Sequence, residues 1–593
     1  MIHLAHLCIA LAIPALATAA AASDVCSVAA IAELPVTMSG LRPLVHAEIN
    51  GKTAKFTADS GAWFSVISPG SAAEYGLKLQ AVSPRFVLKG VGGSVRPSVT
   101  TVDTFTIAGA PVRNVQFLVG GSEFGSVGLL GQNILALGDT EFDLGKGMIR
   151  LMRSQGCADG NLAYWVPVGG NYSMLETERI DGERPHIIAT VSINGMKLRA
   201  MLDTGAGTSF VSLRAAARIG LKPGGAGVRP AGVTHGVGRV PVTTWIGPVA
   251  SIKIGDEEIR NTRLRFGGDW DETDMLLGAD FFLSHHVYWS NRLHKVFFTY
   301  NGGAVFDLRY LDDEEQDIEP DKRPAAAPLK TVADELQPED AASFARRGNA
   351  RASRGDLAGG LADLDRAVAI APEDADLLWQ RASLHQRMRQ SSLALADADH
   401  VLKLRPDDVD ALLMRAQLRR AADEEADIRA DVDAASAAAP ASSDRRLSIA
   451  HFYEDLGEYD RAGTEFGRWI AAHPTDVRKA DALNGRCWVR ALAGTELDRA
   501  LKDCNAALAL RPHQAGFLDS RGLLHLRMKD YPKAIADYDE ALKGAPDLAW
   551  SHYGRGIARL HLGQKEAGEE DLATAHKLDP KLRAFAAKLA IMP

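Results

Sequence analysis

Residues 56–67 read FTADSGAWFSVI, and residues 200–211 read AMLDTGAGTSFV. Each stretch places an aspartate, Asp59 or Asp203, directly before a Ser/Thr-Gly-Ala turn. Apolar and β-branched residues flank both turns, which is typical of strands that enter and leave a tight loop. The two stretches therefore predict that the first half of the chain is β-structure built around two matching loops.

The match continues in register on both sides of the loops. Residues 50–51 and 194–195 are both Asn-Gly, and in each case the glycine precedes the aspartate by eight positions. Asn-Gly between alternating apolar residues is a strong hairpin signal. Gly76 and Gly220 each follow the aspartate by seventeen positions, at the end of an expected helical turn. Such register over a whole segment indicates an internal repeat.

Each copy closes with two bulky apolar residues and a glycine. Gly131 ends the run VGLLG at 72 positions past Asp59, and Gly278 ends MLLG at 75 positions past Asp203. A strand of this kind can pack under a loop and then pass close to other backbone. A final strand pair is expected after each, over residues 140–152 and 286–300.

This constellation resembles the retropepsin-like aspartic proteases, over residues 40–153 for the first copy and 160–300 for the second. Pepsin-like enzymes of that superfamily are similar in having two fused lobes. The resemblance implies two all-β lobes and one active site formed within one chain, with Asp59 and Asp203 as its catalytic pair. It also implies a peptide or protein substrate and no cofactor.

The chemistry explains why two carboxylates are needed. Two carboxylates held close together cannot both ionise cheaply, so they share one proton. The ionised group can then activate a water while the protonated group donates to the scissile carbonyl. Gly61 and Gly205 permit the tight turns that expose backbone N–H groups. In the resembling family the hydroxyls at Ser60 and Thr204 brace the two loops against each other.

A glycine-rich segment follows each loop and is a candidate flap that closes over the site. The candidate residues are Gly90, Val91, Gly92 and Gly93 in the first half, and Thr234, His235 and Gly236 in the second. The alternative is that both are ordinary hairpin turns. One departure between the copies is Trp63, which stands where the second copy has Gly207 and which either shapes a substrate pocket or packs under a loop.

The second half of the chain has the composition of alanine-rich helices. Its prolines recur at intervals of 34, 34, 34, 38, 34 and 34 residues, at positions 372, 406, 440, 474, 512, 546 and 580. A 34-residue period is the signature of tetratricopeptide (TPR) repeats. We therefore expect a multidomain chain in which the all-β lobes are followed by an all-α TPR solenoid of about seven repeats over residues 341–590. The third repeat is the most degenerate, and residues 305–340 read as a linker.

The N-terminus predicts export. Residues 1–22 contain a short apolar stretch that ends in small residues, which is typical of a cleavable signal peptide and predicts a periplasmic or secreted protein. The mature chain then keeps four cysteines, which permit two disulfides, Cys26 with Cys157 and Cys487 with Cys504. The alternative is that all four are buried small hydrophobes.

Other function classes find little support in the sequence. The net charge of −8 over 593 residues, with basic and acidic residues interleaved, argues against a nucleic-acid partner. We find no convincing metal-ligand spacing among the histidines and no second apolar run that would make a stable membrane anchor.

The leading hypothesis is an exported aspartic endopeptidase whose TPR groove recruits a substrate or partner protein. The alternative is a catalytically weak or inactive protease-fold scaffold that acts through this groove. A third hypothesis is that activity requires pairing of each half with a copy from another chain.

Overall fold

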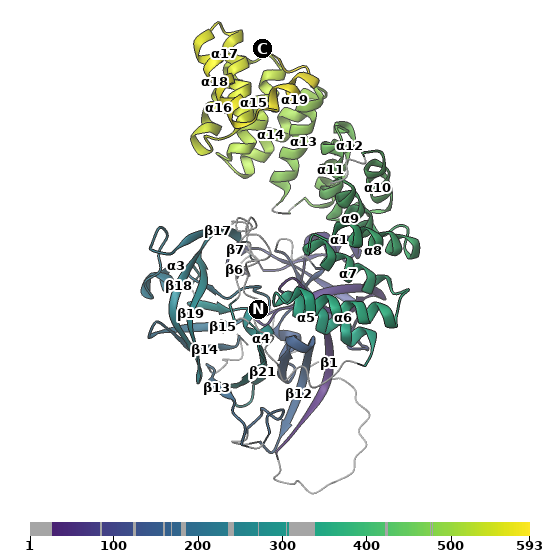
Figure 1. Cartoon of the computed structure of the whole chain (residues 1–593), viewed down its shortest axis with the longest axis vertical. Helices are drawn as coiled ribbons and strands as arrows, with labels where there is room; N and C mark the ends of the chain where they lie inside the picture. The colour runs from purple at the N-terminus through teal and green to yellow at the C-terminus, as the bar shows by residue number, and fades with distance from the viewer. Residues whose placement is uncertain are drawn as a thin grey trace. The chain divides into compact units, whose positions relative to one another are not determined.

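The computed structural model describes residues 26–83, 86–121, 126–157, 161–167, 169–178, 186–234, 236, 242–270, 272–303, 305–306, 339–420, 425–474, 476 and 478–592 (Figure 1). Its contacts divide the chain into two compact units, residues 1–68 with 77–372 and residues 69–76 with 373–593. The first unit contains every described strand, and most of the helices lie in the second. The expected signal peptide and most of the expected linker lie outside the described residues.

Both predicted hairpins are confirmed. In lobe 1, β2 (Arg42–Ile49) and β3 (Lys52–Ala58) pair antiparallel, and in lobe 2, β14 (Ile188–Ile193) and β15 (Met196–Leu202) do the same. Their turns place Asn50 at φ 51° and Gly51 at φ 78°, with almost the same values in lobe 2. Two consecutive positive φ angles are what a two-residue hairpin of this twist requires, and Asn-Gly supplies them at low cost.

Each lobe completes its own sheet around this hairpin. In lobe 2 the strand order is β14-β15-β20-β16-β19-β18-β17, and lobe 1 repeats it as β2-β3-β10-β4-β9-β8 followed by a short edge strand. The further strands of lobe 1 are β4 (Val66–Ile67), β5 (Gln80–Ala81), β6 (Leu88–Gly90), β7 (Gly93–Val95), β8 (Ser98–Ile107), β9 (Ala110–Val119) and β10 (Gly128–Leu130). Those of lobe 2 are β16 (Phe210–Val211), β17 (Arg229–Thr234), β18 (Val242–Ile254), β19 (Glu257–Gly267) and β20 (Met275–Leu277).

Short helices follow the loops at matching places in the two lobes. These are α1 (Pro69–Glu74) and α2 (Gln132–Leu135) in lobe 1, and α3 (Leu213–Arg218) and α4 (Ala279–Ser284) in lobe 2. Helices α2 and α4 each begin directly after the glycine of the apolar-apolar-glycine run. The repeat seen in the sequence is therefore a repeat of whole lobes.

The final strand pairs of the two lobes join in an antiparallel sheet with the order β13-β22-β21-β11-β12-β1, which continues into the strands of lobe 1 through the pairing of β1 with β2. Its strands are β1 (Ser27–Ser39), β11 (Asp139–Asp143), β12 (Met148–Gln155), β13 (Ser173–Glu176), β21 (His285–Ser290) and β22 (Lys295–Tyr300). Strand β11 of lobe 1 pairs with β21 of lobe 2 at Phe142 and Val287, which are both buried. This sheet fixes the two lobes to each other, and through β1 it starts before residue 40, where we expected lobe 1 to begin.

The helical half consists of helix pairs with the expected period. Among the described residues the pairs are α5 (Ala341–Ser353) with α6 (Leu357–Ile370), α7 (Ala375–Arg387) with α8 (Ser391–Leu404), α9 (Val409–Arg420) with α10 (Glu425–Ala438), α11 (Arg445–Asp455) with α12 (Tyr459–Ala472), α13 (Lys479–Ala493) with α14 (Leu497–Leu510), α15 (Ala515–Arg527) with α16 (Tyr531–Gly544), and α17 (Ala549–His561) with α18 (Lys565–Leu578), followed by α19 (Leu582–Lys588). Helices α5 and α6 belong to the same compact unit as the lobes. None of the described helices is both long and apolar enough to span a membrane.

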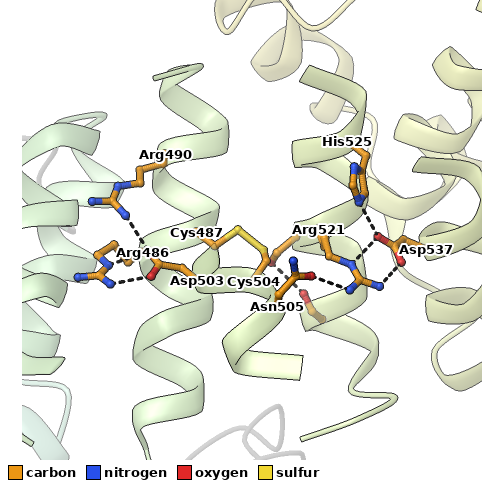
Figure 2. Close-up of a disulfide and its surroundings, with 11 residues drawn as sticks. Arg486, Cys487, Arg490, Asp503, Cys504, Asn505, Arg521, His525 and Asp537 are labelled. Atoms are coloured by element: carbon orange, nitrogen blue, oxygen red, sulfur yellow. Dashed lines mark hydrogen bonds and ion pairs between the residues drawn. A yellow bond between two sulfur atoms is a disulfide. The ribbon is translucent and has the colours of Figure 1, made fainter. Parts of the chain in front are cut away.

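An arginine of the first helix in each pair bonds a buried carboxylate of the second helix, and we call this contact a fork. In the sixth pair, Arg521 donates from Nη2 to Asp537 Oδ1 at 2.7 Å and from Nε to Oδ2 at 2.8 Å (Figure 2). The forks are Arg347–Asp363, Arg381–Asp397, Arg415–Asp431, Arg446–Glu465, Arg486–Asp503, Arg521–Asp537 and Arg555–Asp571. In six of the forks the buried charge is paired through two bonds, whereas Arg446 reaches Glu465 through one bond, from Nη1 at 2.6 Å. Each fork joins the two helices of its own pair.

Two disulfides link cysteines in this structure. One joins Cys26 to Cys157, across 131 positions of sequence. The other joins Cys487 of α13 to Cys504 of α14, beside the fork of that pair (Figure 2). All the cysteines of the expected mature chain are therefore paired, and the buried-hydrophobe alternative does not describe them.

Candidate active site

The structure holds Asp59 and Asp203 by the same pair of supports. Each aspartate follows the last residue of a strand, β3 or β15. The strand of the apolar-apolar-glycine run pairs parallel beside it, as β10 in lobe 1 and β20 in lobe 2. The Asp59 N–H donates to the Leu130 carbonyl at 2.9 Å, and the Asp203 N–H donates to the Leu277 carbonyl at 2.9 Å. The apolar-apolar-glycine run is therefore the backbone platform for each aspartate.

Each carboxylate is oriented by the backbone of its own turn. Gly61 N–H and Ala62 N–H both donate to Asp59 Oδ1 at 2.9 Å. In lobe 2, Gly205 N–H and Ala206 N–H donate to Asp203 Oδ1 at 2.9 and 3.1 Å. Two N–H donors stabilise the charged form of the oxygen that they reach. The other oxygen of each group is free of these bonds.

The two carboxyl groups lie close together, since each one lies against the turn glycine of the opposite lobe. The glycines of the turns are what permits this approach. A Cβ added at Gly61 would lie 2.5 Å from Asp203 Oδ1, and one added at Gly205 would lie 2.5 Å from Asp59 Oδ1. Each glycine therefore makes room for the carboxylate of the opposite lobe.

Burial and proximity change the acidity of the pair. Burial raises the pKa of Asp59 well above its usual value, and the charge of Asp203 raises it further. Burial also raises the pKa of Asp203. Because two close carboxylates cannot both ionise cheaply, the pair retains one proton to higher pH than an ordinary aspartate would. The arrangement thus supplies a base and an acid side by side.

A reciprocal set of four hydrogen bonds, here called the brace, joins the loops beneath the carboxylates. Ser60 Oγ donates to the Leu202 carbonyl at 2.8 Å and accepts from the Thr204 N–H at 2.9 Å. Thr204 Oγ1 donates to the Ala58 carbonyl at 2.8 Å and accepts from the Ser60 N–H at 3.0 Å. Both hydroxyls are fully buried, so the brace cannot be replaced by water.

A second polar contact supports each loop from behind. In lobe 1, Ser65 donates through N–H and Oγ to Asn133 Oδ1 at 2.8 and 2.9 Å. In lobe 2, Ser209 donates through N–H and Oγ to the Asp280 carboxylate at 2.9 and 2.7 Å. Sequence reasoning did not single out Asn133 or Asp280, although each lies two positions after the glycine of the motif in its copy.

The flap candidates lie partly within the described residues. Gly90 ends β6 and Gly93 begins β7, so Val91 and Gly92 form the tip of a hairpin. Val91 packs against an apolar cluster of lobe 2 that includes Phe210 and Trp270. This contact places the tip of the lobe 1 hairpin over the opposite lobe, which an ordinary surface turn would not do.

The second flap candidate is described only in part. Thr234 ends β17, and a Cβ added at Gly236 would lie 3.2 Å from Val91 Cβ. The two candidate segments therefore approach each other. His235 lies outside the described residues.

Trp63 stacks on its neighbour Phe64, with ring centroids 4.8 Å apart, and both rings are only partly buried. Lobe 2 has Gly207 and Thr208 at these positions, and a Cβ added at Gly207 would lie 3.3 Å from Leu41 Cβ. The side chains beside the aspartate are therefore larger in lobe 1 than in lobe 2.

One group of described residues has the ligand types and spacing for a metal ion, namely Glu141, Asp143 and His286. Both oxygens of Glu141 already accept hydrogen bonds, with Arg150 Nη1 at 2.6 Å, Tyr164 Oη at 2.5 Å and His286 Nε2 at 3.0 Å. A metal ion would have to displace a paired arginine there. The donor set fits a buried polar network in the joint sheet better than a metal centre.

The comparisons with known proteins agree with both halves of the chain. Residues 45–136 and 189–284 each match the family model described as gag-polyprotein putative aspartyl protease. The helical half is similar to Tetratricopeptide repeat protein 6 of Homo sapiens, at 28% identity over 142 residues, which is 24% of this chain and 26% of that protein. It is also similar to Protein FlbA of Caulobacter vibrioides, at 33% identity over 113 residues, or 18% of each chain.

Among solved structures, a tetratricopeptide repeat protein from Parabacteroides merdae covers 42% of this chain and 98% of its own length, at 18% identity and a TM-score of 0.33. The chain matches only about a quarter of the length of the first curated relative. Two retropepsin-like aspartyl protease lobes followed by a TPR array are therefore the fold of this chain.

Proposed function

We propose that this chain is an exported aspartic endopeptidase that hydrolyses peptide bonds with Asp59 and Asp203. One observation carries the proposal: the two carboxyl groups lie close together, each against the turn glycine of the opposite lobe, above a symmetric and buried brace.

The reaction follows from the shared proton. The ionised carboxylate takes a proton from a water held between the two groups, and the oxygen of that water forms a bond to the scissile carbonyl carbon. The protonated carboxyl gives its proton to the carbonyl oxygen, so a neutral tetrahedral diol results. When the C–N bond breaks, the protonated carboxyl gives its proton to the leaving nitrogen. A hydroxyl of the diol gives its proton to the ionised carboxylate as the carbonyl forms again, so the pair is left with one proton. Neither role belongs permanently to Asp59 or Asp203.

The helical array recruits a substrate or partner protein in this proposal. Stacked helix pairs form extended surfaces that suit peptides and proteins. One relative is named Hsc70-interacting protein 1, from Drosophila melanogaster, with 32% identity over 126 residues that make up 31% of that protein. Export to the periplasm or outside the cell is supported by the apolar N-terminal stretch and by the two disulfides, which suit an oxidising compartment.

The proposal is tested by incubating the purified chain with a mixed peptide library between pH 3 and pH 7 and identifying new termini by mass spectrometry. We expect cleavage that survives a metal chelator and is lost in Asp59→Asn and in Asp203→Asn. Cleavage that persists in both variants would refute the proposal. No cleavage of any peptide by the parent would favour the scaffold alternative, in which the chain acts through the TPR groove alone.

In this proposal the site is formed within one chain, and the support for this is that the brace joins residues of both lobes of the same polypeptide. Specific activity should therefore stay constant when the enzyme is diluted from micromolar to nanomolar concentration. A fall in specific activity on dilution would instead support pairing between chains.

A further inference from the structure

A cavity of about 390 Å³ lies in the helical array, lined by residues of α11, α12, α13, α15 and α17. Except for α12, these are the first helices of four successive pairs. Residues of several repeats therefore line the cavity, and its volume suits a large side chain of a bound segment. It is separate from the aspartate pair and belongs to the other compact unit.

Aromatic side chains form much of the cavity wall. Trp488 of α13 and Trp550 of α17 meet edge to face, with ring centroids 5.6 Å apart, and both are only partly buried. Phe466 and Phe517 also line the cavity. Partly exposed indole faces attract cations, arginine above all.

The charges that line the cavity are mainly acidic, and His451, whose pKa is raised by its hydrogen bond with Glu454, is the basic side chain of the described lining. Glu454, Asp481 and Asp519 contribute carboxylates, and the described lining contains no lysine or arginine. Two of the three already have partners, because Glu454 bonds His451 and Asp481 pairs with Arg511. Asp519 differs from both, since it is 8% exposed and accepts one hydrogen bond, from Ser551 Oγ at 2.5 Å.

The floor of the cavity therefore has unused acceptors. Burial raises the pKa of Asp519 to about 6, since no cation offsets the desolvation of its carboxylate. Asn484 Oδ1, which belongs to a second lining residue, is buried and has no hydrogen-bond partner among the described residues. Buried acceptors without donors are costly, and a ligand that brings donors would satisfy them.

We propose that this cavity binds an extended peptide segment through one basic side chain, and arginine fits it best. The guanidinium would lie against Trp488 and Trp550 and donate to Asp519 and Asn484. Its planar set of five N–H donors can serve several acceptors at once, which a lysine ammonium does less well. Apolar residues next to the arginine would contact Phe466 and Phe517. This inference rests on the proposed recruiting role of the array and adds the class of its ligand, a basic peptide rather than an acidic one.

The test measures binding, so it does not depend on proteolysis. The full chain carrying Asp59→Asn is titrated against a fluorescent twelve-residue peptide with one central arginine flanked by leucines, followed by fluorescence polarisation. The matched peptide carries citrulline, which has the shape of arginine without its charge, and a third peptide carries glutamate. We expect the arginine peptide to bind at least tenfold more tightly than the citrulline peptide, and the glutamate peptide to bind most weakly.

Variants tie this preference to the cavity. Asp519→Asn should reduce the preference for arginine over citrulline to less than twofold, and Trp488→Leu should weaken the arginine peptide about tenfold. The control is Glu569→Gln on α18, whose side chain is 62% exposed and lies outside the cavity, and it should change nothing. Circular dichroism melts check that each variant is folded. If Asp519→Asn does not fold, Trp488→Leu alone tests whether the arginine peptide binds in the cavity.

Equal affinity for the arginine and citrulline peptides, or tighter binding of the glutamate peptide, would overturn the inference. The result is independent of the protease proposal. If the arginine peptide binds through Asp519 but the parent chain cleaves nothing, the proposed activity fails and the inference stands. If the parent cleaves peptides but shows no charge preference in binding, the inference fails and the proposed activity stands.

Discussion

Lobe 1 and lobe 2 hold their aspartates by the same contacts but surround them with different side chains. The brace uses Ser60 in one lobe and Thr204 in the other with the same four bonds, because only the hydroxyl oxygen takes part. Beside it, Trp63 of lobe 1 stands where lobe 2 has Gly207. The contacts at which the lobes meet are symmetric, whereas the residues at the flanks of the site are not.

The residue behind each loop is the clearest chemical difference between the lobes. Asn133 and Asp280 receive the same two donors from Ser65 and Ser209, but one is a neutral amide and the other is a carboxylate. Burial raises the pKa of Asp280 to about 6. The two lobes therefore keep the same geometry with a neutral acceptor in one and a titratable acceptor in the other. Burial of Asp280 costs an amount of folding free energy that depends on pH, whereas burial of Asn133 does not.

Replacement of a catalytic aspartate should have the largest effect on activity, and this effect should be equal in the two lobes. Asp59→Asn and Asp203→Asn should each lower kcat by roughly 10³-fold, because either change removes the shared proton that general acid–base catalysis needs. Steady-state hydrolysis of one good peptide measures this. Asp256→Asn, at an exposed turn of lobe 2, is the control and should retain full activity. A variant that retains a tenth of the activity would show that one lobe dominates.

A methyl group in one lobe should impair the carboxylate of the other. Gly61→Ala should displace Asp203, and Gly205→Ala should displace Asp59, since the added Cβ lies far inside contact distance. We expect about a 100-fold loss in kcat from each, the usual effect of a displacement of about 1 Å.

Gly516→Ala is the matched control for the glycine variants, because a Cβ there meets nothing within 4 Å. It should leave activity unchanged and raise helix stability by about 0.5–1 kcal/mol. If only one of Gly61→Ala and Gly205→Ala impairs activity, the approach of the carboxylates is less symmetric than the structure has it.

Removal of either hydroxyl of the brace should destabilise both lobes. Ser60→Ala and Thr204→Ala each leave a buried N–H and a buried carbonyl without a partner, so we expect a loss of about 2–4 kcal/mol in the free energy of unfolding of the β unit. Urea denaturation followed by near-UV circular dichroism measures it. The exchanges Ser60→Thr and Thr204→Ser keep the oxygen and should cost less than about 1 kcal/mol. Equal losses from the alanine and exchange variants would contradict this role of the hydroxyls.

The smallest expected effect is a pH-dependent difference in stability that arises from Asp280 of lobe 2. The folded pKa of Asp280, about 6, lies above its usual value of 3.8, so its ionisation costs stability as pH rises from about 4 to about 6. Below pH 4 the group is neutral in both states and the cost vanishes. Above pH 6 the cost levels off at roughly 3 kcal/mol.

Asp280→Asn should therefore gain stability relative to the parent as pH rises from 4 to 7, and Asn133→Asp should lose it over the same range. Thermal melts at several pH values measure both differences. A difference that does not change with pH would show that Asp280 is not the source of the cost.

Much of the lobe fold could be predicted from local signals. The Asn-Gly turns, the strands before each aspartate and the apolar-apolar-glycine run all act through nearby residues, and the duplication made each one visible twice. The pairing of β11 with β21 was missed, since no local pattern says which strand a neighbour will choose across 145 positions of sequence. The partners of the brace, the carbonyls of Ala58 and Leu202, are backbone groups and carry no sequence signal at all.

In the helical half, a regular repeat of acidic residues is a sequence signal for the forks. The fork acceptors Asp363, Asp397, Asp431, Glu465, Asp503, Asp537 and Asp571 repeat at the same intervals as the prolines. A charged residue at a fixed place in every repeat could have been interpreted as a buried pair, because a buried carboxylate needs a partner. The acidic cavity could not be predicted in this way, since its residues come from five helices whose relative positions depend on packing.

The Cys487–Cys504 bond has a mechanical consequence. If an exported protein is pulled by its ends, each helix pair that gives way lengthens the chain by the extended length of its residues. The 17 positions between these cysteines cannot lengthen while the bond is intact, so about 60 Å of extension is withheld from the fifth pair. In a single-molecule pulling experiment this pair should yield a shorter step than its neighbours, and a reducing agent should restore the full step. The disulfide thus makes the fifth helix pair less extensible than the other pairs.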